Sequence, residues 1–285
     1  MAELPIRTEV LPSTDPLLGR NIGHDPRSRA YAYQPRRDEP LRSVRHHSNI
    51  RTLNQHVGSC TCHSALKLCT YQHWFTLSRE QQQLIINDPD GMATDWYRET
   101  TRNDEFPGEW EPTDTGSSGT SASKTAVRRG FAKGFQHSFS FDDTLHMLSQ
   151  NPVAIGVWWY STFDSPNSNG FVSLTPTARR RGGHEFVLDE LNVEEELVWG
   201  QNSWGDSYGV DGRFCFVFDD LERLLNEDGD AVQLTPLDEP APEPDWDLML
   251  AKPLRDWAYS RGFSKWTKAG KAAAASREWL TRKGF

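Results

Sequence analysis

The chain of 285 residues carries a formal net charge of −9 at pH 7, and 36% of its residues are hydrophobic. Its 11 Trp and 14 Phe exclude a disordered chain, because large aromatic side chains supply the burial that offsets chain entropy. Four Cys are too few for a disulfide scaffold, no apolar run reaches the roughly 20 residues that span a bilayer, and the acidic balance disfavours nucleic acid as a partner.

The first part of the chain differs in composition from the rest. Residues 1–47 are rich in Pro and Arg, and we expect an extended arm laid over the body. Such an arm could also occupy a cleft as an inhibitory segment. No apolar run follows a basic one here, so we expect no secretory signal and a cytoplasmic protein, or a virion-associated one if a phage encodes it.

Helices are expected in the first half of a body that spans residues 48–233. Ser59 can cap a helix over 60–69, because its hydroxyl can accept from a free backbone N–H of the first turn. Further helices are predicted from Ser78 onward and at 93–100, 120–129 and 141–149.

After Pro152 the composition shifts to strand-forming residues. Asn192 falls between two such runs, where a hairpin would turn, and strands are predicted at 153–160, 185–188, 197–199 and 213–218. Helices followed by antiparallel strands indicate an α+β fold, with a cleft between the two halves as the expected place for a site.

The last part of the chain is set apart by charge. Residues 234–245 form a Pro-rich acidic linker, which is expected to be extended and semi-rigid. Residues 246–285 carry nine Lys and Arg against three Asp and Glu, with a pattern typical of two short helices. A solvated helical pair, a docking element for an acidic partner, and an anchor for nucleic acid or another anionic polymer all fit this composition, and the first is the commonest.

Three residues could form a nucleophilic site. Cys60 begins the first predicted helix, where the positive end of the helix dipole favours a reactive thiolate. His184 opens a strand behind two glycines that allow close approach, and Asn202 ends the next strand. Neighbouring antiparallel strands would place this Asn beside the imidazole, which is the nucleophile, base and orienting residue of a Cys–His–Asn triad.

The cysteines allow two other interpretations. Cys60 taken alone would more often be a small buried residue. Cys60, Cys62, His63 and Cys69 suggest zinc, but a one-residue gap between two cysteines at a helix start fits zinc poorly. We therefore expect no metal ion and no other cofactor.

The motifs around these residues resemble those of the papain-like cysteine peptidases. Gln55 followed by Gly-Ser-Cys60, then Gly-His184, and then Gln-Asn202-Ser-Trp204-Gly, occur in the same order as in that family. Cys60 precedes His184 by 124 residues and Asn202 by 142, close to the roughly 130–150 typical of the family. The resemblance covers about residues 51–218 and is nearest to the divergent branch found in bacteria and bacteriophages.

The resemblance implies a two-lobed fold and a role for each matching residue. Cys60 would be the nucleophile, His184 the general base and then the acid, Asn202 its orienting partner, and Trp204 a shield against water. Gln55 would donate to the oxyanion, although it lies five residues before the cysteine where the family has six. The implied peptide-binding loop contains Asp114, Gly116 and Ser117.

These roles predict a cysteine-type peptidase. It would hydrolyse amide bonds of polypeptide or peptide-containing substrates through a thioacyl-enzyme. Two alternatives stay open from the sequence: a hydrolase of peptidoglycan cross-links on the same scaffold, and a catalytically idle papain-like protein that binds or supports a partner.

Overall fold

The computed structural model describes residues 7–24, 32–33 and 40–238, which belong to one compact unit. The predicted basic helices of 246–285, and most of the linker before them, lie outside the described residues. In the described ranges no helix is long and apolar enough to cross a membrane.

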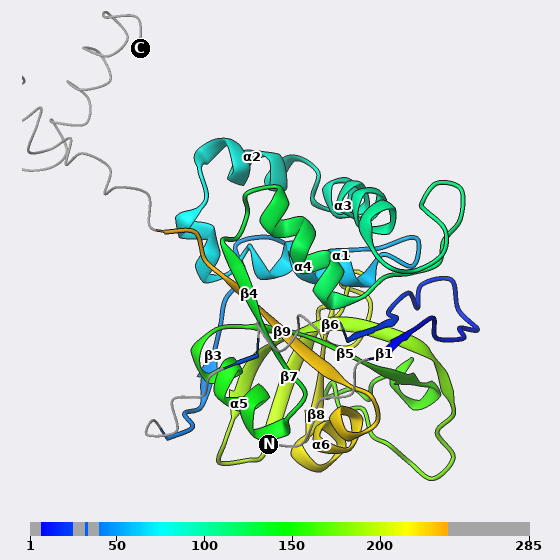
Figure 1. Cartoon of the computed structure of the whole chain (residues 1–285). Coiled ribbons are helices and arrows are strands. Elements are labelled where there is room, and N and C mark those ends of the chain that lie inside the picture. Colours follow the sequence, from blue (N-terminus) through cyan, green and yellow to red (C-terminus); the bar gives the residue numbers. More distant parts are fainter. Residues whose placement is uncertain (1–6, 25–31, 34–39, 239–285) are drawn as a thin grey trace, which may run out of the picture. The chain divides into compact units, whose positions relative to one another are not determined.

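The helices fall into two groups on either side of a sheet (Figure 1). One group belongs to the first half of the body: α1 (Cys60–Leu68), α2 (Arg79–Asn87), α3 (Pro89–Asn103) and α4 (Gly119–Arg128). The other group lies between the strands along the chain: α5 (Phe141–Gln150), α6 (Phe218–Asn226) and the short 3-10 helix η3 (Ser161–Phe163). A second 3-10 helix, η2 (Gln72–Thr76), follows α1.

The central feature is an antiparallel sheet with seven strands in the described part of the chain. Along its main path the order is β4-β9-β5-β6-β7-β8, and β3 pairs with the far end of β6. The strands are β3 (Val44–Arg45), β4 (Gly134–Ser138), β5 (Val153–Tyr160), β6 (Arg180–Asn192), β7 (Leu197–Gln201), β8 (Arg213–Val217) and β9 (Asp230–Thr235). The last strand thus returns to lie between β4 and β5.

Alternate residues of the central strands enter two different hydrophobic cores. Val153, Ile155 and Val157 of β5 pack in the core under α5 and α6, whereas Ala154 packs in the core that α1 and α4 share with the sheet. Successive side chains of a strand point to opposite faces, so a strand buried on both faces joins the two cores. This arrangement gives the two lobes that were predicted.

Several predicted elements have the expected position but a different length. The strand over 153–160 is reproduced as β5, whereas the strand predicted at 185–188 is the centre of the much longer β6. Strands β4 and β9 and helix α6 were not predicted. β9 begins after a single acidic turn and continues to Thr235, into the range that composition had assigned to the linker.

The first part of the arm pairs with itself and is tied to the body by the core. Its strands β1 (Arg7–Glu9) and β2 (Ile22–His24) pair with each other. Leu11, Leu18 and Ile22 are buried in the core under α5 and α6. The described arm residues are therefore an integral part of the folded unit.

Candidate active site

Cys60 is the first residue of α1, as predicted, and is completely buried. Ser59 occupies the N-cap position, but its hydroxyl makes no capping hydrogen bond; it lies 3.1 Å from Nδ1 of His63 instead. The capping bond predicted for Ser59 is therefore wrong, because a buried imidazole one turn later competes for the hydroxyl. Helix α1 packs against β6, the strand that carries His184.

His184 and Asn202 are brought together as the strand pattern predicted. Asn202 directly follows β7, and its Oδ1 lies 2.8 Å from Nε2 of His184. Both residues are buried. The indole rings of Trp204 and Trp159 lie over and beside the imidazole, each with its centroid 4.8 Å from the imidazole centroid. Trp204 thus covers the imidazole of His184, in agreement with the shielding role predicted for it.

The sulfur of Cys60 lies beside the strand residue that follows His184. Backbone groups of Gly19 and Glu185 lie near the thiol and favour its charged form. Nδ1 of His184 is buried and has no hydrogen-bond partner among the described residues. The imidazole therefore keeps one nitrogen free for a further proton transfer.

Gln55 is placed near the nucleophile but is already engaged. Its Nε2 donates to the carbonyl oxygens of Leu17 and Val57, each at 2.8 Å, and its Oε1 accepts from the hydroxyl of Ser203. Leu17 belongs to the arm. The amide that was expected to bind an oxyanion thus binds two backbone carbonyls of the chain itself.

The three residues of the predicted peptide-binding loop have different roles. Asp114 accepts from the backbone N–H of Gly58 at 2.8 Å and from the hydroxyl of Tyr97, so it fixes the loop before Cys60. Gly116 has a φ of 71° and leaves room for the carbonyl of Gly19, which a Cβ would approach to 2.2 Å. Ser117 forms the backbone hydrogen bonds between this loop and the arm.

An arm segment lies along this loop in the position where a peptide would be expected. Ser117 N–H donates to the carbonyl of Gly19 at 2.8 Å, and its own carbonyl accepts from Asn21 N–H at 2.6 Å. On the other side, Arg20 N–H donates to the carbonyl of Gly183 at 2.9 Å, next to His184. The arm is therefore held from both sides by backbone hydrogen bonds, as a strand is held in a sheet.

The arm approaches the body too closely for ordinary side chains. A Cβ on Gly19 would come within 1.9 Å of the carbonyl oxygen of Gly58, and a Cβ on Gly183 within 2.0 Å of the carbonyl of Arg20. The two glycines before His184 were expected to allow a close approach. In the structure, the segment that approaches Gly183 is the backbone of the arm at Arg20.

Burial keeps both reactive groups neutral in this arrangement. Burial, reinforced by the charge of Glu185, raises the pKa of the Cys60 thiol to about 12. Burial also lowers the pKa of His184 to about 4, against the opposing hydrogen bond to Asn202. The thiolate expected from the helix dipole is thus not present while the arm covers the site, because desolvation outweighs the dipole and the backbone donors.

Three further residues near the nucleophile were not identified from the sequence. Arg20 of the arm is buried and forms an ion pair with Asp230 of β9. Glu185 is also buried and lies close enough to interact electrostatically with Cys60 and with this pair. The one available signal was Glu185, a charged residue at the start of the predicted strand 185–188, whose other residues are apolar. Asp230 lay in a stretch for which no strand had been predicted.

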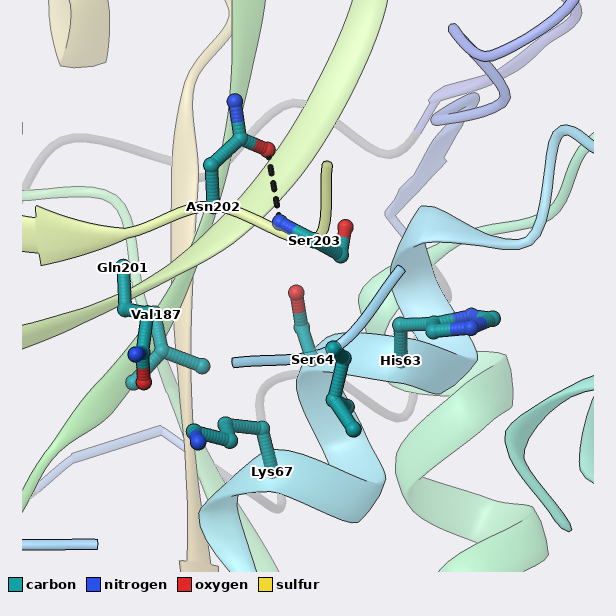
Figure 2. A pocket seen from close by; sticks show the side chains of 8 residues that line it. His63, Ser64, Lys67, Val187, Gln201, Asn202 and Ser203 are labelled. Carbon is teal, nitrogen blue, oxygen red and sulfur yellow. Dashed lines mark hydrogen bonds between the residues drawn. The ribbon is translucent and has the colours of Figure 1, made fainter. Parts of the chain in front are cut away.

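A small cavity lies behind the site, between α1 and β7 (Figure 2). Its volume is about 10 Å³, close to the minimum that holds one water molecule. Asn202 Nδ2 and His63 Nε2 are buried near it without partners among the described residues, and Lys67 lines it. This space is too small for a substrate, and its polar lining fits a bridging water.

The cysteines suggested as zinc ligands contact different parts of the protein. Cys62 contacts Thr100, and Cys69 donates to the carbonyl of Ala65. Within the described ranges there is no group of three or more His, Cys, Asp or Glu side chains that could hold a metal ion.

No protein-family model and no curated protein sequence matches the chain. Among solved structures it is similar to xylellain, a cysteine protease from Xylella fastidiosa, at 15% identity and a TM-score of 0.59 over 82% of this chain and 100% of that one. Procathepsin L 3 of Tenebrio molitor larval midgut (13%, TM-score 0.46, 72% and 73%) and a mite-allergen structure concerned with Blo t 1 and Der p 1 (17%, 0.46, 72% and 76%) are less similar. The likeness to xylellain confirms the predicted papain-like α+β fold.

Proposed function

We propose that the protein is a cysteine-type peptidase with Cys60 as nucleophile, His184 as general base and acid, and Asn202 as the orienting residue. One observation carries the proposal: the 2.8 Å contact between Nε2 of His184 and Oδ1 of Asn202, with His184 on β6, which packs against the helix that begins with Cys60. That contact leaves Nδ1 free, as a base requires. Xylellain, which shares the fold, is a cysteine protease.

The proposed reaction proceeds in two balanced steps. The Cys60 thiol gives its proton to Nδ1 of His184 while the sulfur attacks the peptide carbonyl carbon, and the amine product leaves with that proton. Water then gives a proton to the same nitrogen and attacks the thioester. The acid product leaves, and the proton returns to the sulfur. The N–H of Cys60 and the amide of Gln55 are the proposed donors to the oxyanion.

The arm explains how such an enzyme would be held inactive. While residues 17–21 lie along Ser117 and Gly183, a substrate has no access, and both Cys60 and His184 are kept neutral. Withdrawal of the arm would admit water and substrate together. We therefore propose that activity requires displacement of this segment.

The test uses a full-length chain in which the arm cannot dock. Gly19→Val places a side chain against the Gly58 carbonyl and should expel residues 17–21. We expect this variant to cleave peptide pools, as read by mass spectrometry. Adding Cys60→Ala or His184→Ala should lower the rate by about a thousandfold or more.

Cys215→Ala is the matched control, because Cys215 is equally buried but lies on β8 away from the site. It should retain the peptidase activity of the Gly19→Val parent. Equal rates with and without the Cys60 thiol would refute the proposal and leave an idle papain-like protein. Cleavage confined to cell-wall cross-links would instead identify a peptidoglycan hydrolase.

A further inference from the structure

The side chain of Arg20 enters the body from the arm segment that covers the nucleophile. Only 1% of this side chain is exposed, and Nη2 donates to Oδ1 of Asp230 and, at 2.8 Å, to the carbonyl of Asp228. Arg20 lies between Gly19, which contacts the Cys60 thiol, and Asn21, which bonds to Ser117. The guanidinium is therefore inserted beside the nucleophile by a segment bound as a peptide would be.

The slot that receives the guanidinium is formed by three laterally paired residues on three neighbouring strands of the sheet. Glu185 of β6 is paired with Gly156 of β5, and Gly156 is paired with Asp230 of β9. Paired residues of neighbouring strands point to the same face, so the two carboxyl groups flank a position without a side chain. A Cβ on Gly156 would come within 2.7 Å of Nε of Arg20. The missing side chain at this position leaves the space that the guanidinium fills.

Arg20 of the arm uses only part of the hydrogen-bonding capacity of the slot. Nε and Nη1 of Arg20 are buried without hydrogen-bond partners among the described residues. Glu185 is also buried, and Arg20 and Asp230 act on its carboxyl through space. Burial and the nearby Asp230 raise the pKa of the Glu185 carboxyl well above its usual range, so this group is neutral. Its oxygens can still accept from the donors that Arg20 leaves unused.

The slot is bounded on its other sides by features that favour a planar cation. A Cβ on Gly119, the first residue of α4, would meet Oε2 of Glu185 at 2.5 Å, so this helix closes one wall. His137 of β4 lies 2.8 Å from the second oxygen of Asp230 and holds that carboxylate in place. A guanidinium, with donors spread in a plane, can contact Asp230, the Asp228 carbonyl and Glu185 together, which a single ammonium cannot do.

We propose that this slot is a substrate subsite for an arginine side chain, placed within one or two residues of the bond that Cys60 attacks. The arm would then inhibit by presenting Arg20 where a substrate presents its own arginine. This assignment rests on the proposed peptidase function. The residues of the subsite are Gly156, Glu185 and Asp230.

The test measures binding without turnover. The probe is a synthetic peptide of residues 14–23, compared with the same peptide carrying citrulline at position 20, which keeps the shape and removes the charge. The protein is the full chain with Gly19→Val and Arg20→Ser to empty the slot and Cys60→Ala to prevent cleavage. By calorimetry we expect the arginine peptide to bind at least about tenfold more tightly.

Two carboxylate variants locate the effect. Asp230→Asn should bring the two peptides to within about twofold of each other, whereas Asp219→Asn, which removes an equal charge from an exposed site on α6, should preserve the difference. Equal binding of both peptides with Asp230 intact, or binding of neither, overturns the subsite. Peptide cleavage without preference for arginine would likewise overturn it while leaving the peptidase intact.

Failure of the peptidase proposal would give a different result. Selective binding of the arginine peptide, without cleavage of any peptide by the chain that retains Cys60, would support the arginine subsite and refute the peptidase activity. If Gly19→Val prevents folding, Arg20→Ala in the full chain carries the test. Added ethylguanidinium should then raise its melting temperature by several degrees relative to ethylammonium at equal concentration. It should do so only when Asp230 is present, and an equal shift with both ions contradicts the proposal.

Discussion

At the scale of single residues, the orientation of Asn202 decides which nitrogen of His184 can act as a base. Oδ1 of Asn202 accepts from the backbone N–H of Ser203 at 2.8 Å (Figure 2), which fixes the amide orientation. The same oxygen can only accept from His184, so Nε2 carries the proton and Nδ1 keeps its lone pair. The amide therefore sets the tautomer as well as the position of the ring.

Replacement of Asn202 tests this role directly. In the Gly19→Val chain, Asn202→Ala should lower kcat by about a hundredfold with little change in KM, because the imidazole loses its orientation while the cleft is unchanged. Steady-state kinetics on one peptide substrate gives both constants. Asn192→Ala, at the partly buried end of β6, is the control. A change confined to KM would argue against an orienting role.

The protonation of Cys60 should report whether the arm is docked. Because burial raises the pKa of its thiol to about 12, the wild-type chain should react with iodoacetamide slowly at pH 7 to 9, with a rate that rises as pH approaches 12. Gly19→Val should label Cys60 at least about a hundredfold faster at pH 7.5, as followed by peptide mass spectrometry. Equal rates in the two chains would show that residues 17–21 do not protect the thiol.

At the scale of elements, α1 is unusual because all nine of its residues are buried. Lys67 in its last turn is 3% exposed, and its Nζ donates to the carbonyls of Ile50 and Arg51 at 3.3 and 2.9 Å. Burial lowers the pKa of this amine to about 7. Helix α1 thus brings a poorly solvated cation close to the site.

This cation makes stability depend on pH. Between about pH 7 and 10.5 the unfolded chain protonates Lys67 more than the folded one, so this residue's contribution to the free energy of unfolding increases as pH rises through that window. Lys67→Met should remove the increase. Urea unfolding at pH 7 and 9 should show the wild type gaining stability relative to the variant, by up to about 1.4 kcal/mol per pH unit.

Lys133→Met provides the comparison for Lys67, because Lys133 is half exposed on the surface and pairs with Asp238. Its difference from the wild type should be the same at both pH values. If the difference between Lys67→Met and the wild type is also constant, Lys67 stays protonated in the folded chain over this range and burial does not lower its pKa.

The elements found from the sequence are those with strong local signals. Ser78 and Gln81 form the capping box that starts α2, and β5 is a continuous run of strand-forming residues. β9 was missed because its residues, Asp230–Thr235, mix polar and apolar types, and only pairing with β4 and β5 makes them a strand. Tertiary pairing here overrides weak local preference.

At the scale of the whole molecule, one buried ion pair ties the arm to the body. Arg20 comes from the arm and Asp230 from the last strand, and their pairing lowers the pKa of the carboxyl although burial opposes it. Breaking such a pair leaves a charge in a poorly solvated place, which costs about 3–5 kcal/mol. The arm should therefore contribute to stability as well as cover the site.

A double-mutant cycle measures this contribution. Arg20→Met should lower the free energy of unfolding by about 3 kcal/mol, and adding Asp230→Asn should recover part of the loss, because the stranded charge is then removed. Arg7→Met breaks a half-exposed pair with Asp228 and should cost no more than about 1 kcal/mol. If Arg20→Met changes stability no more than Arg7→Met, the pair does not hold the arm.

The sequence by itself determined the α+β fold, with helices before most of the strands, and it predicted the proximity of His184 and Asn202, because these depend on local patterns and on motifs with fixed spacing. Only the tertiary structure decided that Gln55 binds the arm, that the thiol is neutral, and that Glu185, Gly156 and Asp230 form one row. The register between distant strands and the path of an irregular arm depend on long-range packing. Short-range propensities do not encode them.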